Sequence, residues 1–321
     1  MTNKCTLIGC GGMGINIVKR FLNKGDDGFA NLDIYMLDTS RSNIPKEVNE
    51  DHIYLFDGLD GSGKLRSSNY ATIAERSREI LQKVKPSDLT ILVHSASGGS
   101  GSVIGPVLVS ELMKKDTMVI VVTIGSSDSR IEAENSIKTL KSYAVIADKH
   151  NKPVNVIYSQ NTETMNRGAV DKVIETNIIL STLFFSGDNR ELDKSDLRNF
   201  LNYDRVTSYK PMLTLVDFFS GKVALGKDQS VVTAVTLIDD ETQSTLDTHV
   251  EYQAVGFIPS TIKSLGDIKL PLHMVTISNY FNDVITGLDN KLKQIDEARS
   301  AVVHKTIVNR DEAATDLGIV L

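Results

Sequence analysis

The feature that most constrains the fold is the regular alternation of β-rich runs and helical segments in the first half of the chain. Two runs, Leu89–His94 and Met118–Ile124, are almost continuously apolar and rich in β-branched residues. Such runs are typical of strands that are buried on both faces of a parallel sheet. A segment with helical periodicity, Gly99–Lys115, separates them. The alternation therefore predicts an α/β fold with a parallel, doubly wound sheet and right-handed crossovers.

The same rhythm predicts the other elements of the first half. Further strands are expected at Lys4–Gly9, Leu32–Asp38, His52–Phe56 and Pro153–Tyr158. Further helices are expected from Ile15 to a stop at Gly25, over Ser68–Val84 and over Ile131–Lys149.

The rhythm changes after Tyr158. Gly168–Phe185 is a long, rather apolar helical run, which predicts a buried central helix. A short helix is expected over Asp193–Tyr203 and a last long helix over Asn282–Ala301. Four runs between these two helices are expected to be strands: Pro211–Phe219, Val231–Ile238, Tyr252–Ile258 and Leu272–Ser278. The second half is therefore expected to form a smaller α+β domain, followed by a C-terminal helix and a tail.

Composition places the chain among globular proteins of a reducing compartment. Its 321 residues are 41% hydrophobic and carry a formal net charge of −6, from 35 basic and 41 acidic residues. An acidic chain without a basic cluster is a poor sequence-independent binder of nucleic acid. Neither a long apolar run nor a signal-peptide pattern is present, so no membrane association is expected. Cys5 and Cys10 are too few for a disulfide framework, and we expect a cytoplasmic protein without a metal site built on its own side chains.

A glycine-rich turn, Gly9–Asn16, lies where the first predicted strand meets the first predicted helix. Glycines allow the backbone to approach a phosphate closely, and a helix N-terminus offers free N–H groups. The turn also fits the G-x-G-x-x-G pattern of dinucleotide-binding folds, and Asp38 stands where a ribose-binding acid is expected. Taken alone, this turn leaves open a two-domain, NAD-dependent oxidoreductase.

A second turn, Ser97–Ser102, follows the strand Leu89–His94 and opens the next helix. It predicts a second anion cradle at the same edge of the sheet, with serine hydroxyls as additional donors. Two such cradles suit a compact triphosphate held from both sides, whereas a dinucleotide needs only one. A nucleotide-binding scaffold without turnover is a third reading of the same turns.

A third segment, Gly58–Leu65, nearly fits the phosphate-binding pattern G-x-x-x-x-G-K-[ST]. Leu65 replaces the metal-binding hydroxyl of that pattern, and the segment follows the third strand, so a true loop of that class is not expected. Gly61, Ser62 and Gly63 are instead candidates for a contact with a terminal phosphate.

As a pair, the two turns resemble the nucleotide loops of the tubulin/FtsZ superfamily, and most of all those of the phage-encoded tubulins, the PhuZ family. Ser97–Ser102 (SGGSGS) is similar to the family loop written GGGTGSG, and Gly9–Asn16 is similar to the first family loop, including the closing Asn16. The resemblance covers essentially the whole chain. It implies GTP or GDP and Mg²⁺ as ligands, and GTP hydrolysis as the activity.

The resemblance also implies a domain organisation. It places a nucleotide-binding GTPase domain at 1–166, a central helix at 167–187, a hydrolytic loop and helix at 188–205, a C-terminal α+β domain at 206–278, and a C-terminal helix and tail at 279–321.

The resemblance further implies which residues bind the nucleotide. Asn161, after the strand Pro153–Tyr158, and Asp171, near the start of the long helix, correspond to the residues that read guanine. A carboxylate accepts from guanine N1–H and the exocyclic amine, which adenine cannot offer. Without the resemblance, the two residues suit a loop-capping Asn and a solvated Asp. The full nucleotide-binding set is Gly11, Gly12, Met13, Gly14, Asn16, Asp38, Gly61, Ser62, Gly63, Gly98, Gly99, Ser100, Gly101, Ser102, Asn161 and Asp171.

The family's hydrolytic loop corresponds here to Leu192–Leu197, in which Asp193 and Asp196 match the D-x-x-D part. In the family this acidic pair reaches into the nucleotide site of the neighbouring subunit, where it can position and polarise the attacking water. Taken alone, the residues favour helix capping, with Asp193 as the N-cap and Asp196 in the first turn. Both roles are compatible. Glu191 departs from the family pattern, since many relatives carry Asn at that position.

A second departure follows the fifth strand, where Ile124–Arg130 replaces the family's Pro-Phe loop. Arg130 and Glu132 are candidates to take over contacts with the ribose and the phosphates. His94, at the end of a buried strand, is expected to be a core histidine.

The family mechanism implies a head-to-tail homopolymer whose catalytic site exists only between subunits. It implies a spindle-like filament that positions phage DNA in the host cytoplasm without binding DNA directly. The C-terminal tail, with Asp311, Glu312 and Asp316, is expected to contact the adjacent subunit, and the acidic turn Asp239–Glu241 is expected to lie between subunits. Solvated surface is the alternative for both segments.

Overall fold

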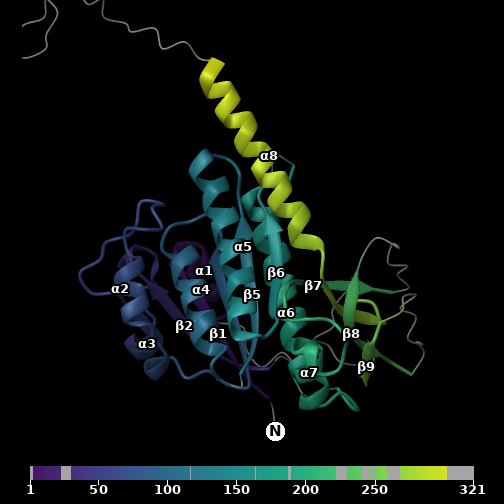
Figure 1. The fold of residues 1–321 in the computed structure, drawn as a ribbon. Coiled ribbons are helices and arrows are strands. Elements are labelled where there is room, and N and C mark those ends of the chain that lie inside the picture. The colour runs from purple at the N-terminus through teal and green to yellow at the C-terminus, as the bar shows by residue number, and fades with distance from the viewer. Residues whose placement is uncertain are drawn as a thin grey trace, which may run out of the picture.

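Ten strands form one continuous sheet in the computed structural model of the chain (Figure 1). The order across the sheet is β3-β2-β1-β4-β5-β6-β7-β10-β8-β9. The structure describes residues 3–22, 30–115, 117–162, 164–186, 189–221, 230–240, 246, 250–258 and 268–301.

The strands are β1 (Lys4–Cys10), β2 (Asn31–Asp38), β3 (Ile53–Leu55), β4 (Leu89–Ser95), β5 (Met118–Gly125), β6 (Val154–Gln160), β7 (Leu213–Ser220), β8 (Val231–Ile238), β9 (Tyr252–Phe257) and β10 (Leu272–Ile277). The α-helices are α1 (Gly11–Val18), α2 (Tyr70–Glu75), α3 (Ser77–Lys83), α4 (Gly101–Leu112), α5 (Arg130–His150), α6 (Arg167–Phe185), α7 (Lys194–Leu201) and α8 (Tyr280–Ala301). Single 3₁₀ turns lie at Lys19–Phe21, Arg41–Asn43, Glu50–His52 and Tyr203–Arg205.

The predicted α/β class is confirmed, with every predicted strand present in the sheet. Neighbouring strands from β3 through β6 pair in parallel, as the alternation of elements predicts. The second half adds antiparallel pairs, because β10 runs between β7 and β8 and opposes both. A short parallel contact of three residue pairs, starting at Val154 and Leu213, joins β6 to β7. The sheet therefore continues across the predicted domain boundary, and the domain limits stay predictions.

One helix that is predicted to be continuous is divided in the structure. The segment Ser68–Val84 forms two short helices, α2 and α3, which meet at Arg76 with φ −87° and ψ 3°. The Ser77 hydroxyl donates to the carbonyl oxygen of Ala74 at 2.8 Å. Serine side chains that bond nearby backbone carbonyls in this way favour a bend over a straight helix.

Helices cover both faces of the sheet. Buried residues of α1, α6 and α7 belong to one hydrophobic cluster, together with Cys5 and Leu7 of β1. Buried residues of α3, α4, α5 and α8 belong to the other cluster, together with Ile8 and Cys10 of the same strand. The alternation of β1 side chains between the two clusters follows from the two-residue period of a strand.

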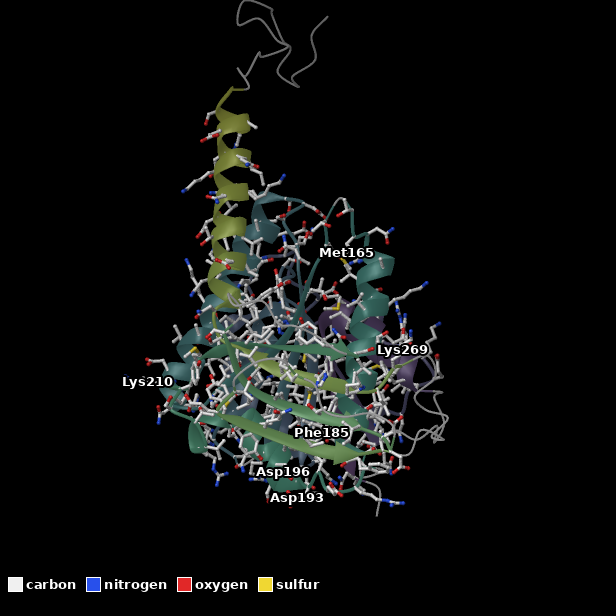
Figure 2. The ribbon with its side chains drawn as sticks, turned by 90° about the vertical axis from the view of Figure 1, so that its right-hand side faces the viewer. Met165, Phe185, Asp193, Asp196, Lys210 and Lys269 are labelled. Atoms are coloured by element: carbon white, nitrogen blue, oxygen red, sulfur yellow. The ribbon has the colours of Figure 1, made fainter. Side chains whose placement is uncertain are left out.

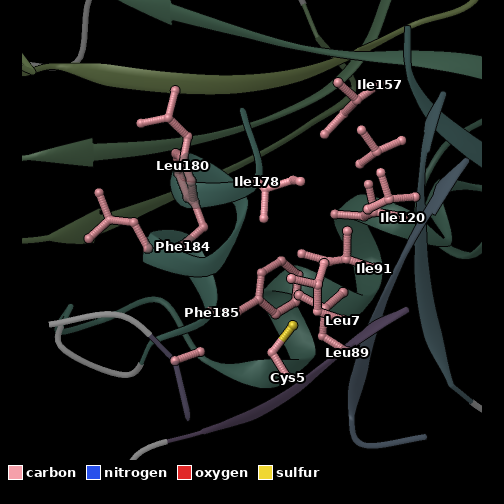
Figure 3. Packing of buried hydrophobic residues seen from close by; sticks show 14 of the residues in the cluster. Cys5, Leu7, Leu89, Ile91, Ile120, Ile157, Ile178, Leu180, Phe184 and Phe185 are labelled. Carbon is pink, nitrogen blue, oxygen red and sulfur yellow. The ribbon is translucent and has the colours of Figure 1, made fainter. Parts of the chain in front are cut away.

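The central helix α6 is buried progressively along its length. Apart from Val170 and Ile174, the side chains of its first turns are exposed or half-buried, whereas Leu183 and Phe184 near its end have no exposed surface. Figure 3 shows Ile178 and Phe185 of this helix on the side of the labelled side chains of β1, β4 and β5, whereas the centroid of the Phe184 ring lies 6.3 Å from that of the Phe218 ring in β7. The predicted buried central helix is confirmed for its C-terminal half.

The last helix, α8, lies against α5 (Figure 1). Phe281 and Leu288 of α8 are buried in the same cluster as α5, and Arg130 of α5 pairs with Asp296 of α8 at 2.9 Å. None of the helices in the described residues combines the length and hydropathy needed to span a bilayer. The tail beyond residue 301 and Glu241 of the acidic turn lie outside the described residues.

We predict that Phe184→Ala lowers the stability of the fold by about 3–5 kcal/mol, because it leaves a cavity under the fully buried end of α6. Val173→Ala, on the same helix at 39% exposure, should change stability by less than about 0.5 kcal/mol. Urea unfolding followed by circular dichroism measures both variants. Equal shifts of the two unfolding midpoints would contradict the burial gradient of α6.

Candidate functional site

Two glycine-rich turns meet at the carboxyl edge of the parallel strands. The turn that opens α1 follows β1, and the turn that opens α4 follows β4, which is the hydrogen-bonded neighbour of β1. A Cβ atom on Gly101 would lie 2.6 Å from the carbonyl oxygen of Cys10, and Gly11 has φ +69°. The two turns are therefore in direct backbone contact and form one concave surface, which we call the cradle (Gly11–Gly14 and Gly98–Ser102).

The N-termini of both helices point into this surface with free donors. Neither α1 nor α4 has a side-chain cap at its N-terminus. The first N–H groups of an uncapped helix are available to an anion, and the helix dipole favours negative charge there. The Ser102 hydroxyl instead donates to the carbonyl oxygens of Gly98 and Gly99, so it holds the second turn in shape.

The loop after β2 forms one wall of the cradle. The hydroxyls of Thr39 and Ser100 lie 2.6 Å apart, and the Asn43 side chain packs directly on Gly12. Asp38 is only 3% exposed, and its carboxylate accepts from the Thr39 N–H at 2.7 Å and from the Asn43 amide at 3.3 Å. Burial raises the pKa of Asp38. Sequence reasoning missed Thr39 and Asn43, although they lie one and five positions after the acid that it found.

The segment Gly58–Leu65 closes a second wall. A Cβ atom on Gly99 would meet Ser62 Oγ at 1.8 Å, so the segment lies against the second turn. The amide nitrogen of Asn135, on α5, donates to the carbonyl oxygens of Ser97, Gly98 and Lys64 at 3.2, 3.1 and 2.9 Å. Asn135 therefore ties the two segments together. No sequence motif marks Asn135, because its role depends on the packing of α5.

The predicted base-reading residues follow β6 and lie near the start of α6. The backbone N–H of Asn161 donates to Gly125 O at 3.0 Å, while its side-chain oxygen is buried and has no hydrogen-bond partner in the described part of the chain. Asp171 pairs with Arg20 at 2.7 Å, and the Arg20 guanidinium also reaches Glu175. Asn16 accepts from Lys19 Nζ at 2.7 Å. An unpartnered buried amide oxygen fits a ligand that brings N–H donors, such as guanine.

The predicted acidic pair lies at the opposite edge of the sheet. Lys194, between Asp193 and Asp196, forms an ion pair with Asp88, which directly precedes β4. The cradle follows the other end of that strand, and seven extended residues span about 23 Å. Figure 2 shows both acids at the bottom of the molecule and Met165, which precedes α6, far above them. The acidic pair therefore cannot reach the cradle of its own subunit.

Comparison with known proteins identifies the kind of domain that carries this site. Residues 4–151 match the model of the Tubulin/FtsZ family, GTPase domain. Residues 4–151 therefore form a GTPase domain of the Tubulin/FtsZ family. The match covers both glycine-rich turns and assigns a GTPase activity to this tubulin-like chain.

The relatives are phage proteins. A phage tubulin-like protein of Pseudomonas phage PhiPA3 is 25% identical over 322 residues, which cover 97% of each chain. The structure titled as a protofilament of TubZ from bacteriophage PhiKZ has a TM-score of 0.85 at 22% identity. The phage tubulin PhuZ, titled as a GDP complex, has a TM-score of 0.87 at 20% identity. Both alignments cover 99% of each chain, and this tubulin-like chain shares their fold.

The alternative of an NAD-dependent oxidoreductase is not supported. Its ribose-binding acid would be Asp38, but that carboxylate is buried and accepts hydrogen bonds from Thr39 and Asn43. The second turn, which a dinucleotide does not need, packs directly on the first. The family match agrees with this geometry.

The acidic pair of the tubulin-like chain caps α7. Asp193 Oδ1 accepts from the backbone N–H groups of Ser195 and Asp196, and Asp196 Oδ2 accepts from the N–H of Asp193 at 3.1 Å. This is a reciprocal capping box. The Tyr252 hydroxyl donates to Asp196 Oδ1 at 2.9 Å. The predicted capping role is confirmed, and the hydrolytic role stays a prediction.

Arg130 and Glu132, the two residues after β5 that are candidates for contacts with the ribose and the phosphates, have different surroundings. Glu132 lies beside the cradle, where it accepts from Lys64 Nζ at 2.6 Å and from the hydroxyls of Ser126 and Ser129. Arg130 is turned towards α8 and pairs with Asp296 and Glu134. Of the two, only Glu132 is linked to the walls of the cradle.

The buried histidine and cysteines have structural surroundings. His94 is fully buried beside the Tyr143 hydroxyl, and burial lowers the pKa of His94 to about 4, so it is neutral at physiological pH. Cys5 and Cys10 are free and buried, which raises the pKa of both thiols. Within the described ranges, no group of three or more His, Cys, Asp or Glu side chains could hold a metal ion. The expected core role of His94 agrees with its burial.

We predict that Gly14→Ala and Gly98→Ala have different effects. A Cβ atom on Gly14 would lie 2.1 Å from the carbonyl oxygen of Val93, so Gly14→Ala should destabilise the fold by at least about 2 kcal/mol. A Cβ atom on Gly98 would meet only Ser95, at an ordinary 3.5 Å, so the fold should keep its melting temperature. Calorimetry of the two purified variants measures the difference. Similar melting temperatures would refute the close backbone contact at Gly14.

A second prediction concerns Asp38. Because its pKa is raised in the folded state, stability should fall as the pH rises from about 4 through that raised pKa. Asp38→Asn removes this titration and keeps one acceptor oxygen. The free energy of unfolding of Asp38→Asn relative to the wild type should therefore increase from about pH 4 to pH 8. Urea titrations across this range test the sign, and a difference that shrinks with rising pH would be the opposite result.

Proposed function

We propose that this chain is a GTP-dependent, filament-forming tubulin in which Asp193 and Asp196 of one subunit complete the GTP site of the next. The observation that carries the proposal is the placement of the cradle and the acidic pair at opposite edges of one sheet. A site divided in this way becomes complete when subunits stack head to tail. Stacking of this kind is a heterologous contact that does not close on itself, so it produces a filament.

The cradle would hold the phosphates of GTP or GDP. Uncapped N–H groups of α1 and α4 would bind the phosphate oxygens, and Ser62 would approach from the neighbouring wall. Mg²⁺ would be held mainly by phosphate oxygens and water, with the Thr39 and Ser100 hydroxyls nearby. When bound, the ion would neutralise charge on the phosphates.

The guanine base would lie between α1 and the N-terminal turns of α6. The unpartnered oxygen of Asn161 would accept from the base. The carboxylate of Asp171 would share its acceptor capacity between the base and Arg20. Both acceptors favour guanine, whose N1–H and exocyclic amine are donors.

Asp193 and Asp196 would act on the terminal phosphate of the neighbouring subunit. The capping box fixes both carboxylates, so they enter the interface already oriented. Fixed carboxylates can orient a water molecule for attack, and phosphoryl transfer depends mostly on positioning and electrostatics. Assembly and hydrolysis would then be coupled, because neither subunit alone holds the complete site.

We further propose that the filament acts as a spindle that positions phage DNA in the host cytoplasm without binding it directly. The relatives support this as phage tubulin-like proteins, one of them known as a protofilament. The segment 302–321 would contact the adjacent subunit, and its support is the exposure of the last described side chains of α8, 297–300, directly before it. Domain limits at 1–166, 167–187, 188–205, 206–278 and 279–321 belong to the same proposal.

The test separates capping from hydrolysis. Asn caps a helix as well as Asp does, so Asp193→Asn should change stability by less than about 0.5 kcal/mol, whereas Asp193→Ala should lose about 1 kcal/mol. Both variants should bind GTP like the wild type and release phosphate at least about tenfold more slowly, a loss of about 1.4 kcal/mol in transition-state stabilisation. Light scattering with parallel phosphate release measures this, and filaments of either variant should persist longer. Asp148→Asn, an exposed acid near the end of α5, is the matched control and should behave like the wild type.

Protein concentration provides the decisive comparison. Phosphate release per subunit by the wild type should rise steeply above a threshold concentration, since the site forms between subunits. Release per subunit that stays constant from nanomolar to tens of micromolar protein would overturn the shared site. A lack of GTP-dependent scattering over the same range would overturn the filament.

A further inference from the structure

Of the three glycine-rich segments, only Gly58–Leu65 carries a basic residue, Lys64. Its backbone is unusual, because Lys64 has φ +66° in the left-handed region, directly after Gly63 at φ +54°. Non-glycine residues adopt this region at a cost, and such residues cluster at functional sites. The conformation places the Cα atom of Lys64 within 3.0 Å of the Cβ position at Gly99, against the cradle.

The backbone of Lys64 is held in place by a side chain of α5. Asn135 donates to its carbonyl oxygen and, with the same amide nitrogen, to the carbonyl oxygens of Ser97 and Gly98. The next basic residue, Arg66, is not available to the cradle, since its guanidinium donates to Thr139 and to the backbone of α5. Lys64 is therefore the cation that these segments bring to the phosphate side.

Among the described residues, the ammonium of Lys64 has one acidic partner, Glu132, and that carboxylate also accepts from other donors. Lys64 Nζ lies 2.6 Å from Glu132 Oε1, and the Lys64 side chain is 52% exposed. The other oxygen of Glu132 accepts from the hydroxyls of Ser126 and Ser129. Partial burial opposes the ionisation of Glu132, but Lys64 and these hydroxyls lower its pKa. Glu132 is therefore an ionised carboxylate with several hydrogen-bond donors around it. If Lys64 moves away, the Glu132 carboxylate still accepts hydrogen bonds from the two serine hydroxyls.

A nucleoside triphosphate presents more negative charge to this wall than a diphosphate does. The two turns offer the phosphates backbone N–H groups and hydroxyls, which are neutral, and Asp38 in the wall is buried and accepts from Thr39 and Asn43. Charge-assisted hydrogen bonds are stronger than neutral ones. The terminal phosphate is therefore a stronger partner for Lys64 than a carboxylate that serine hydroxyls already satisfy.

We propose that the ammonium of Lys64 moves from Glu132 to the terminal phosphate when a nucleoside triphosphate enters the cradle, so that Lys64 is the residue by which this site distinguishes GTP from GDP. The inference rests on the proposed function, because it needs guanine nucleotides in the cradle. Glu132 then competes with the terminal phosphate for Lys64, and this competition sets how much Lys64 increases the affinity for the triphosphate.

Affinities for fluorescently labelled GTP and GDP, measured below the concentration of assembly, test this exchange. Lys64→Met should weaken GTP binding about tenfold or more and GDP binding less than about threefold. Glu132→Gln should increase the preference for GTP over GDP several-fold, because the competing charge is gone. Lys138→Met is the matched control, since Lys138 also pairs with an acid on α5 and is similarly exposed, and its affinities should equal those of the wild type.

The outcomes separate this inference from the proposed function. A wild type that binds neither nucleotide overturns both. A wild type that binds GTP, with Lys64→Met weakening GTP and GDP equally or neither of them, overturns the exchange alone. If Lys64→Met does not fold, Lys64→Gly, which suits the positive φ, gives the same readout. An unchanged preference in Glu132→Gln likewise removes Glu132 as the competitor.

Discussion

The nucleotide half of this molecule depends on one contact, the backbone-to-backbone packing of two turns at the ends of β1 and β4. The strands are hydrogen-bonded neighbours, so their turns emerge side by side. Glycine at Gly101 and Gly14 lets each turn approach a carbonyl oxygen of the other strand more closely than any side chain would allow. The walls of the cradle are then added to this base: Asn43 packs on Gly12, and Ser62 packs on Gly99. The close packing of the two turns requires glycine at these positions, and the proposed close approach of a phosphate requires it as well.

The second organising element is α6, which links the two halves through its burial. Its last turn packs among side chains from β1, β4 and β5, so it cannot shift without disturbing the core (Figure 3). Its first turns are open and carry Asp171, paired with Arg20. The acidic pair follows the buried end, in a capping box that fixes both carboxylates. One helix thus carries a proposed base-reading residue at its open end and is anchored at its other end, beside the surface that the proposed filament uses.

Much of the fold could be predicted from the sequence, because buried parallel strands such as Leu89–Ser95 are continuously apolar and glycine marks where they turn. The family resemblance supplied the acidic pair, which spacing alone could not separate from capping. Features that depend on long-range packing could not be predicted: the burial of Asp38, the amide of Asn135 between two segments, and the pairing of Asp171 with Arg20. The break at Arg76 coincides with a hydrogen bond from the Ser77 hydroxyl to the carbonyl oxygen of Ala74, which the helical periodicity of the segment does not reveal.

The length of α6 has a consequence for any polymer built in the proposed way. Its 19 residues rise about 28 Å from the end that carries the proposed base-reading Asp171 to the end that precedes Asp193. If each acidic pair meets the nucleotide of the next subunit, the vector from one nucleotide to the next runs through this helix. The fixed length of α6 then sets the part of the polymer repeat that lies inside each subunit. Adjustments at the subunit surfaces can tilt or twist the filament, while the helix keeps the spacing of its nucleotides.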